Sequence, residues 1–220
     1  MVKTFFITGT DTGCGKTYVT CQLLNYLHSL GHSALALKPV ACGLIQKNGR
    51  WVSEDVLLLE QHNQNAADDI CRWQFKAPVS PHIAAAREGK ALSIKDIADF
   101  CSASHFPKLD YLLIEGAGGL MVPLNPQETW LDFLRLTAMP VILVVGMRLG
   151  CLNHALLTDS VLKKHHVTCA GWVANCLDNH MLALEDNIEL LAQTLNYPQL
   201  ATVGYQAPLS SQSFQSECFI

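Results

Sequence analysis

Gly15, Lys16 and Thr17 form a short motif near the start of the chain whose residue types suit phosphate binding. Together with Gly9 and Gly13 they belong to a glycine-rich turn, in which a backbone without Cβ atoms can approach phosphate oxygens closely. Lys16 would reach the β- and γ-phosphates of a nucleotide, and the Thr17 hydroxyl would be a ligand of Mg²⁺. The first glycine stands one residue earlier than the strict Gly-x-x-x-x-Gly-Lys-Thr pattern requires, so the turn is a variant of it.

The elements on either side of this turn would place it for that role. Residues 5–7 are apolar, as in a buried strand, and residues 18–27 carry apolar side chains at helical spacing. The first N–H groups of a helix have no partner within it, and the helix dipole adds positive charge there, so a polyphosphate is stabilised at this end. Strand, glycine-rich turn and helix in this order predict the phosphate loop of a nucleotide-binding protein.

Two more strand ends carry charged residues that would serve such a loop. Residues 110–115 are nearly all apolar, end in Glu115 and are followed by glycines within 116–119. In phosphate-loop enzymes a carboxylate at this position holds Mg²⁺ or its waters, and at a buried strand end it would be costly without a partner. Lys38 ends the short strand expected over 33–40. Ligands bind beyond the carboxyl ends of parallel strands, so we expect Lys38 at the same edge.

The remaining pattern predicts an α/β protein with a mostly parallel central sheet flanked by helices on both faces, in a phosphate-loop NTPase fold. Residues 43–51 are polar and turn-rich, 63–80 are irregular, with a fixed extended loop at 77–82, and no element is predicted beyond Tyr197. The other expected elements are strands over 141–146 and 169–175 and helices over 53–59, 83–88, 93–100, from 151 onward and over 181–195.

Composition limits the classes of function. The chain has 220 residues, half of them hydrophobic, which suits one domain with a substantial core. The net charge is −4, there is no basic block and the longest apolar run is short, so we expect neither nucleic-acid nor membrane binding. The nine cysteines include no Cys-x-x-Cys pair and no signal peptide is evident, so we expect a reducing cytoplasm without disulfides or a zinc site.

Six motifs together resemble the dethiobiotin synthetase family, in the family's order and spacing, from residue 4 to about 177. They are Gly9-Thr10-Asp11-Thr12 with Gly15-Lys16-Thr17, then Lys38-Pro39-Val40, Ser80-Pro81-His82, Glu115-Gly116-Ala117-Gly118-Gly119, Val144-Val145-Gly146 with Gly150-Cys151-Leu152-Asn153-His154-Ala155, and Gly171-Trp172-Val173-Ala174-Asn175. The resemblance implies a homodimeric cyclo-ligase that depends on ATP and Mg²⁺ and acts in biotin synthesis. It would join CO₂ to 7,8-diaminononanoate, with residues 1–220 as a single ATP-binding cyclo-ligase domain.

The resemblance also implies roles for individual residues. Lys16 and Lys38 would be catalytic, and Thr17, Asp55 and Glu115 would hold Mg²⁺. The nucleotide would contact Gly13, Cys14, Gly15, Lys16, Thr17, Tyr18 and, through its adenine, Asn175. The substrate would contact Thr12, Lys38, Cys42, Pro81 and Gly118, and its carboxylate tail would meet Gly150, Cys151, Leu152 and Asn153 of the partner subunit. Taken alone, Asp55 is also explained as an ordinary acidic residue in a first helical turn, and Asn175 as a turn former.

Two positions depart from the family's pattern. Many relatives carry an acid where this chain has Gly13, so any contact of that side chain with ATP or metal is absent. Position 42 is often Ser, and Cys42 is a poorer hydrogen-bond partner for a substrate.

Two other classes of phosphate-loop protein stay open from the residues. A switch ATPase of the partitioning type would share the loop and the acid-ended strand, but it usually has a second lysine where this chain has Asp11, and it gives no reason for Lys38 beside Pro39. An amidoligase of the cobyrinate-synthase type needs an ammonia source, usually a glutaminase domain, for which 220 residues leave no room.

Overall fold

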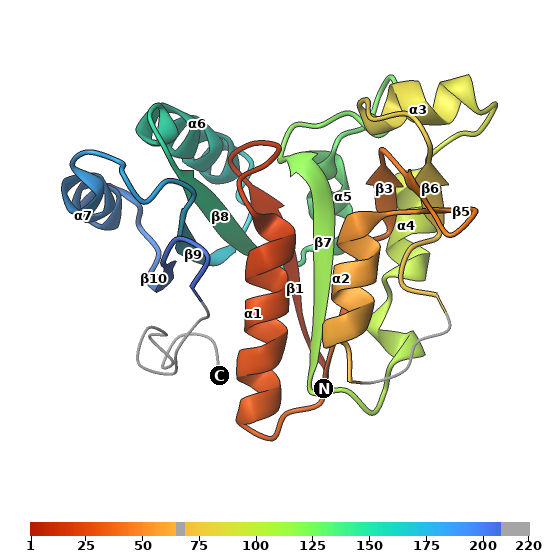
Figure 1. Cartoon of the computed structure of the whole chain (residues 1–220), viewed down its shortest axis with the longest axis horizontal. Helices are drawn as coiled ribbons and strands as arrows, with labels where there is room; N and C mark the ends of the chain where they lie inside the picture. The colour runs from red at the N-terminus through yellow and green to blue at the C-terminus, as the bar shows by residue number, and fades with distance from the viewer. Residues whose placement is uncertain (65–68, 208–220) are drawn as a thin grey trace.

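The chain forms a twisted parallel sheet with helices on both faces, as the computed structural model shows for residues 1–64 and 69–207 (Figure 1). Six strands lie in the order β10-β9-β8-β1-β7-β2, and each neighbouring pair is parallel. They are β1 (Lys3–Gly9), β2 (Ala34–Leu37), β7 (Tyr111–Gly119), β8 (Val141–Met147), β9 (Cys169–Cys176) and β10 (Gln199–Val203). The predicted α/β architecture is confirmed.

The central strands are apolar because they are covered on both faces. Every residue of β8 is buried, and so are the first six residues of β7. Side chains on both faces of a parallel sheet lie against helices, so its strands are near-continuous apolar runs without alternation. These apolar runs are the pattern from which strands β1, β7, β8 and β9 were predicted.

Helices complete the layers. In Figure 1, α1 (Lys16–Ser29) and α2 (Glu54–His62) lie in front of β1 and β7, while α4 (Ile94–Phe100) and α5 (Trp130–Thr137) lie behind them. On the far side of β1, α6 (Cys151–Lys164) and α7 (Leu184–Thr194) contact each other beside β8–β10. Phe6 packs its ring 5.3 Å from Trp130 and 5.4 Å from Phe133, so α5 is anchored to β1 by aromatic contacts. No helix within the described residues is long and apolar enough to cross a membrane.

Short elements on one side of the sheet were missed by the sequence prediction. The turn-rich segment 43–51 contains a hairpin, β4 (Ile45–Lys47) and β5 (Arg50–Val52), and the irregular segment 63–80 contains β6 (Trp73–Phe75), which pairs in parallel with β3 (Val40–Cys42). The hairpin turns at Asn48 and Gly49, both with positive φ, and Asn-Gly favours this turn. A short 3₁₀ turn, η1 (Ala103–His105), together with α5 and β10, was likewise not predicted.

The helix starts agree only in part with the sequence prediction. Ser53 caps α2 as predicted, because its hydroxyl accepts a hydrogen bond from the Val56 N–H. Ser93 precedes α4 but makes no such bond; the Ile94 N–H donates to Glu128 instead. An extended loop was expected at 77–82, but its last two residues already belong to helix α3 (Pro81–Arg87). Pro81 is suited to the first helical position because the backbone N–H there would have no partner within the helix.

Candidate active site

The phosphate loop joins β1 to α1 in a conformation that requires glycine at position 15. Gly15 precedes α1 in the left-handed region with φ of 84°, and a Cβ there would lie 2.0 Å from the amide nitrogen of Asn175. That amide, at the end of β9, donates a 2.9 Å hydrogen bond to the Cys14 carbonyl oxygen. Gly15 is therefore required twice, for its backbone angle and for the space that Asn175 occupies.

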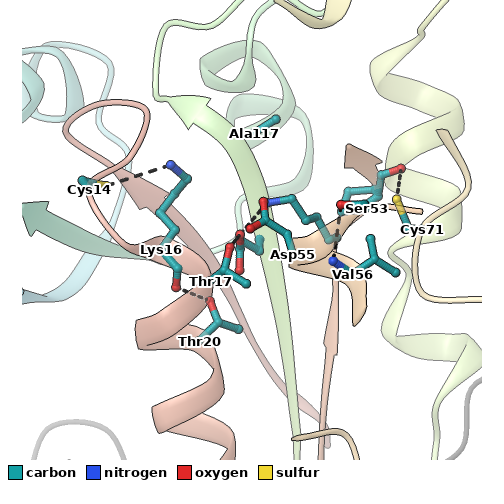
Figure 2. A network of polar contacts seen from close by, with 12 residues as sticks. Cys14, Lys16, Thr17, Thr20, Ser53, Asp55, Val56, Cys71 and Ala117 are labelled. Carbon is teal, nitrogen blue, oxygen red and sulfur yellow. Dashed lines mark hydrogen bonds and ion pairs between the residues drawn. The ribbon is translucent and has the colours of Figure 1, made fainter. Parts of the chain in front are cut away.

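Four polar side chains from distant parts of the chain meet beside this loop. The Lys38 ammonium lies 2.6 Å from Glu115 Oε1 and 2.8 Å from Asp55 Oδ2, and the Thr17 hydroxyl donates to Glu115 Oε1 at 2.7 Å. Figure 2 shows Thr17 of α1 and Asp55 of α2 pointing toward one another, with Lys16 beside Thr17 at the start of α1. The fold thus brings the start of α1, the end of β2, the start of α2 and β7 to one point.

The charges of this cluster stabilise one another. Burial by itself lowers the pKa of Lys38, but Glu115 and Asp55 outweigh it and hold that pKa above its usual value. Burial raises the pKa of Asp55, yet the attraction and hydrogen bond of Lys38 bring it below 3.8. Lys38 therefore stays protonated and Asp55 ionised at neutral pH.

One buried oxygen in the cluster has no partner. Glu115 is fully buried, and its Oε2 makes no hydrogen bond, although buried carboxylate oxygens are normally paired. Two carboxylates and a hydroxyl are the hard oxygen donors that Mg²⁺ prefers. The residues present therefore fit the ion, and the unpaired oxygen supplies a ligand position that no side chain fills. No group of three His, Cys, Asp or Glu side chains that could hold a metal is found among the described residues, this site included, so its third oxygen donor is the Thr17 hydroxyl.

A cavity of about 650 Å³ opens between the cluster and the phosphate loop. Its lining includes both lysines, Lys16 and Lys38, and the sequence-predicted residues Thr12, Gly13, Gly15, Thr17, Tyr18, Cys42, Asp55, Pro81 and Gly118. Such a volume suits a small ligand with a few fixed polar contacts. Most of the predicted substrate contacts and much of the predicted nucleotide loop therefore face one space.

Comparison with known proteins decides the family. The family described as "AAA domain" matches residues 3–213. ATP-dependent dethiobiotin synthetase BioD of Legionella pneumophila (strain Corby) is 49% identical over 209 residues, which cover 95% of this chain and 97% of that protein. The same-named protein of Alteromonas mediterranea is 40% identical, with 98% and 97% covered. This chain belongs to the ATP-dependent dethiobiotin synthetase family. The resemblance seen in the sequence motifs is thereby confirmed.

Solved structures of more distant proteins share the fold. Chloroplast FtsY from Physcomitrella patens aligns with a TM-score of 0.55 at 19% identity, covering all of this chain and 66% of that one. The MinC:MinD cell division complex of Aquifex aeolicus gives 0.56 at 14% identity, with 93% and 82% covered. These likenesses concern the fold alone, which this dethiobiotin synthetase family member therefore shares with proteins of other function.

Several predicted residues lie outside the cavity of this family member. Cys14 is buried, and Asn175 contacts the phosphate loop, so neither lines the cavity within one chain. The tail-binding residues Gly150, Cys151, Leu152 and Asn153, at the start of α6, do not line it either. Their assignment to nucleotide and substrate stays a prediction.

The sequence prediction missed an ion pair at the tip of the phosphate loop. Arg148, in the turn between β8 and α6, lies 2.6 Å from the Asp11 carboxylate, and His154 lies 4.0 Å from it. Asp11 also accepts the Thr12 N–H at 2.7 Å. The loop tip is therefore tied to the start of α6. Only the opposite charges of two loops that follow adjacent parallel strands could have signalled this pair.

Proposed function

We propose that this chain ligates CO₂ to 7,8-diaminononanoate with ATP and closes the ureido ring to give dethiobiotin, ADP and phosphate. One observation carries the proposal. In a member of the dethiobiotin synthetase family, the phosphate loop, Lys38 and Asp55 face a single cavity of about 650 Å³, and Glu115 is buried behind them in contact with Lys38. A phosphoryl donor and an anionic acceptor can be brought together there, which is the main requirement of phosphoryl transfer.

The reaction proceeds through anions. One amine of the substrate attacks CO₂, a C–N bond forms, and a proton leaves to solvent as the carbamate is made. A carbamate oxygen attacks the γ-phosphorus, and the bond to the β-phosphate oxygen breaks, which gives ADP and a carbamic–phosphoric anhydride. The second amine attacks the carbonyl carbon, loses its proton and expels phosphate. No covalent enzyme intermediate is needed, so Cys14 and Cys42 have no nucleophilic role.

The chain's own groups would stabilise these anions. Loop N–H groups and Lys16, whose ammonium donates to the Asp11 carbonyl oxygen at 3.1 Å, lie where phosphates would bind. Lys38 and Thr12, both on the cavity wall, would hold the carbamate. Burial raises the pKa of Cys42 to about 11, so this thiol is neutral at pH 7 and would contact the substrate without charge.

Mg²⁺ would be held by Thr17, Asp55 and Glu115. When bound, it neutralises charge on the transferring phosphoryl group. The unpartnered Oε2 of buried Glu115 supports this assignment.

A homodimer would complete the site. The helix start at Gly150–Asn153 does not line the cavity of its own chain, and a second copy would bring its own helix start to the substrate's carboxylate tail. Fully exposed Leu149 and nearly fully exposed Leu182 leave apolar surface near α6 and α7 that a second copy would cover. We also propose that residues 1–220 form one domain, and that the protein works in the cytoplasm. Light scattering after size exclusion would test the dimer; a monomer at micromolar concentration would contradict it.

Phosphate release measured with and without the diamine tests the function. The purified protein is given ATP, Mg²⁺ and bicarbonate, and dethiobiotin is followed by mass. We expect release to require the diamine and to match dethiobiotin one to one, and to stop when EDTA removes the metal. ATP hydrolysis that is indifferent to the diamine, with no ring product, would contradict the proposal and favour a switch ATPase.

A further inference from the structure

The Lys38 ammonium holds together the two carboxylates that are proposed to bind the metal. It lies 2.6 Å from Glu115 Oε1 and 2.8 Å from Asp55 Oδ2, and its side chain is 5% exposed. A single cation therefore contacts both acids and offsets one of their two negative charges. An ammonium is a compact point charge on a flexible stem, so it can take this position without fixed geometry.

Hydrogen bonds fix the backbone at Lys38, but its side chain can move away from the two carboxylates. The Lys38 N–H donates to the Ile70 carbonyl oxygen at 2.9 Å, and the Trp73 N–H donates to that of Pro39 at 3.0 Å. The strand end is thereby held from the side by the segment 70–73. Four rotatable bonds connect this anchor to the ammonium, and the side chain borders the cavity. A swing of the ammonium from the carboxylates into the cavity needs no backbone movement.

A divalent cation and this ammonium compete for the same oxygens. Mg²⁺ binds oxygen ligands at about 2.0–2.1 Å and would draw Asp55 and Glu115 toward itself. Two cations sharing these carboxylates would repel each other, most strongly at the buried Glu115 side of the site. Lys38 contacts Oε1 of Glu115, and the buried Oε2 has no hydrogen-bond partner, so the metal would not share Oε2 with the lysine.

We propose that Lys38 is a resident counter-ion that Mg²⁺ displaces, so that metal binding releases the lysine into the substrate cavity. Without metal, the lysine offsets part of the negative charge of the two clustered acids. With metal, the freed ammonium would enter the cavity that Thr12 and Cys42 also line, where an anionic substrate group can accept its hydrogen bonds. The proposal rests on the proposed function in two respects, since Asp55 and Glu115 are taken to bind Mg²⁺ and that anion is taken to be the carbamate. Metal and substrate anion would then each strengthen binding of the other.

Lysine labelling tests the displacement in the unaltered protein. The protein with ADP is acetylated briefly in EDTA or in excess Mg²⁺, and labelled lysines are measured by mass spectrometry. We expect acetylation of Lys38 to rise severalfold with Mg²⁺. Lys163 is the internal control, because it also pairs with a carboxylate, that of Asp159 at 2.8 Å within α6, and its labelling should not change. Lys38 labelling that is unchanged or reduced by Mg²⁺ would overturn the proposal.

Metal affinity of two variants gives a second readout. Mn²⁺ binding, followed by electron paramagnetic resonance without diamine, should be about tenfold tighter in Lys38→Met, because no cation competes for the carboxylates. Lys38→Arg keeps the competing charge and should bind no more tightly than the parent. Equal or weaker Mn²⁺ binding in Lys38→Met, with the parent's circular dichroism, would contradict displacement.

Failure of this inference and failure of the proposed function give different results. A protein that makes dethiobiotin but shows no Mg²⁺-dependent labelling of Lys38 keeps its function and loses the displacement. A protein that shows the labelling change but makes no dethiobiotin keeps the displacement and loses the function. Neither result depends on the activity of the Lys38 variants.

Discussion

Two ion pairs of the same length hold the active site, and they differ in burial. Lys38 and Glu115 lie 2.6 Å apart with side chains 5% and 0% exposed. Arg148 and Asp11 also lie 2.6 Å apart, but their side chains are 43% and 42% exposed. Water screens the second pair and not the first, so loss of one partner leaves a buried charge in one case and a solvated charge in the other. Distance alone would rank the two pairs equal.

The two pairs also connect different parts of the molecule. The buried pair joins β2 to β7 beneath the cavity, and Thr17 and Asp55 extend it to α1 and α2. The exposed pair joins the phosphate-loop tip to the start of α6, where the tail-binding residues are proposed. We therefore expect the first to set stability and catalysis, and the second to adjust the position of the loop.

Glu115→Ala should have the largest effect. It leaves Lys38 buried with half its partners, and breaking a buried pair typically lowers the free energy of unfolding by about 3–5 kcal/mol. Dethiobiotin formation should fall about 10²–10³-fold, as when one electrostatic contact to a transition state is removed. Asp11→Ala is the matched control, with an expected loss of stability below about 1 kcal/mol. Urea unfolding measures both, and similar losses would contradict the comparison.

The same contrast exists within the backbone of the phosphate loop. Gly15 and Gly13 both have positive φ, 84° and 69°, but a Cβ at Gly15 would meet Asn175 at 2.0 Å while nothing lies within 4 Å of one at Gly13. Alanine at either position adds similar backbone strain, and only Gly15→Ala adds a collision. We expect Gly15→Ala to be less stable than Gly13→Ala by about 1–3 kcal/mol. Equal thermal unfolding midpoints would show that Asn175 simply moves aside.

Acid should weaken the buried cluster through Asp55. Lys38 outweighs the effect of burial and lowers the Asp55 pKa below 3.8, so the folded protein binds this proton less readily than the unfolded chain. Its contribution to stability is fully present above pH 3.8 and is lost as pH falls through the lowered value. Asp55→Asn should therefore lose less stability than the parent as pH falls below about 4, where the parent's Asp55 takes up its proton. Parallel stability curves would contradict this assignment.

The exposed pair should give the smallest effect. A double-mutant cycle with Asp11→Asn and Arg148→Gln should give a coupling of about 0.2–1 kcal/mol. The coupling should shrink when salt is raised to about 1 M, since screening then acts within about 3 Å. A coupling above about 2 kcal/mol that salt leaves unchanged would mean that Arg148 and Asp11 are shielded, as in a closed dimer.

The sequence predicted those elements whose pattern is local. The strand–turn–helix around Lys16 and the acid-ended strand at Glu115 each combine an apolar run with a special residue, so β1, α1 and β7 were expected. The hairpin at 45–52 is short and mostly exposed, with no buried face to impose alternation. Its only signal was Asn48-Gly49. Similarly, β6 has three residues, which is too few to show a period.

The site residues also divide into those that a local sequence pattern predicted and those that depend on the tertiary fold. Thr17 and Glu115 are 98 positions apart, but each ends a recognisable motif, so the residues alone suggested that both serve one metal. Asp55 carried no such signal, because an acid in a first helical turn is ordinary, and its place beside Lys38 depends on how α2 packs against α1. Only the family resemblance singled it out. The Asp11–Arg148 pair depended on the conformation of two loops, which no periodicity records.

Incorporation of labelled bicarbonate tests the central claim most directly. The protein is given ATP, Mg²⁺, the diamine and [¹³C]bicarbonate, in the parent and in Glu115→Gln. We predict that the parent forms dethiobiotin carrying one ¹³C in its ureido carbonyl and one phosphate per product, while Glu115→Gln forms little of either. Phosphate without labelled dethiobiotin in the parent would contradict the account, because the cavity would then hydrolyse ATP without joining CO₂ to the diamine.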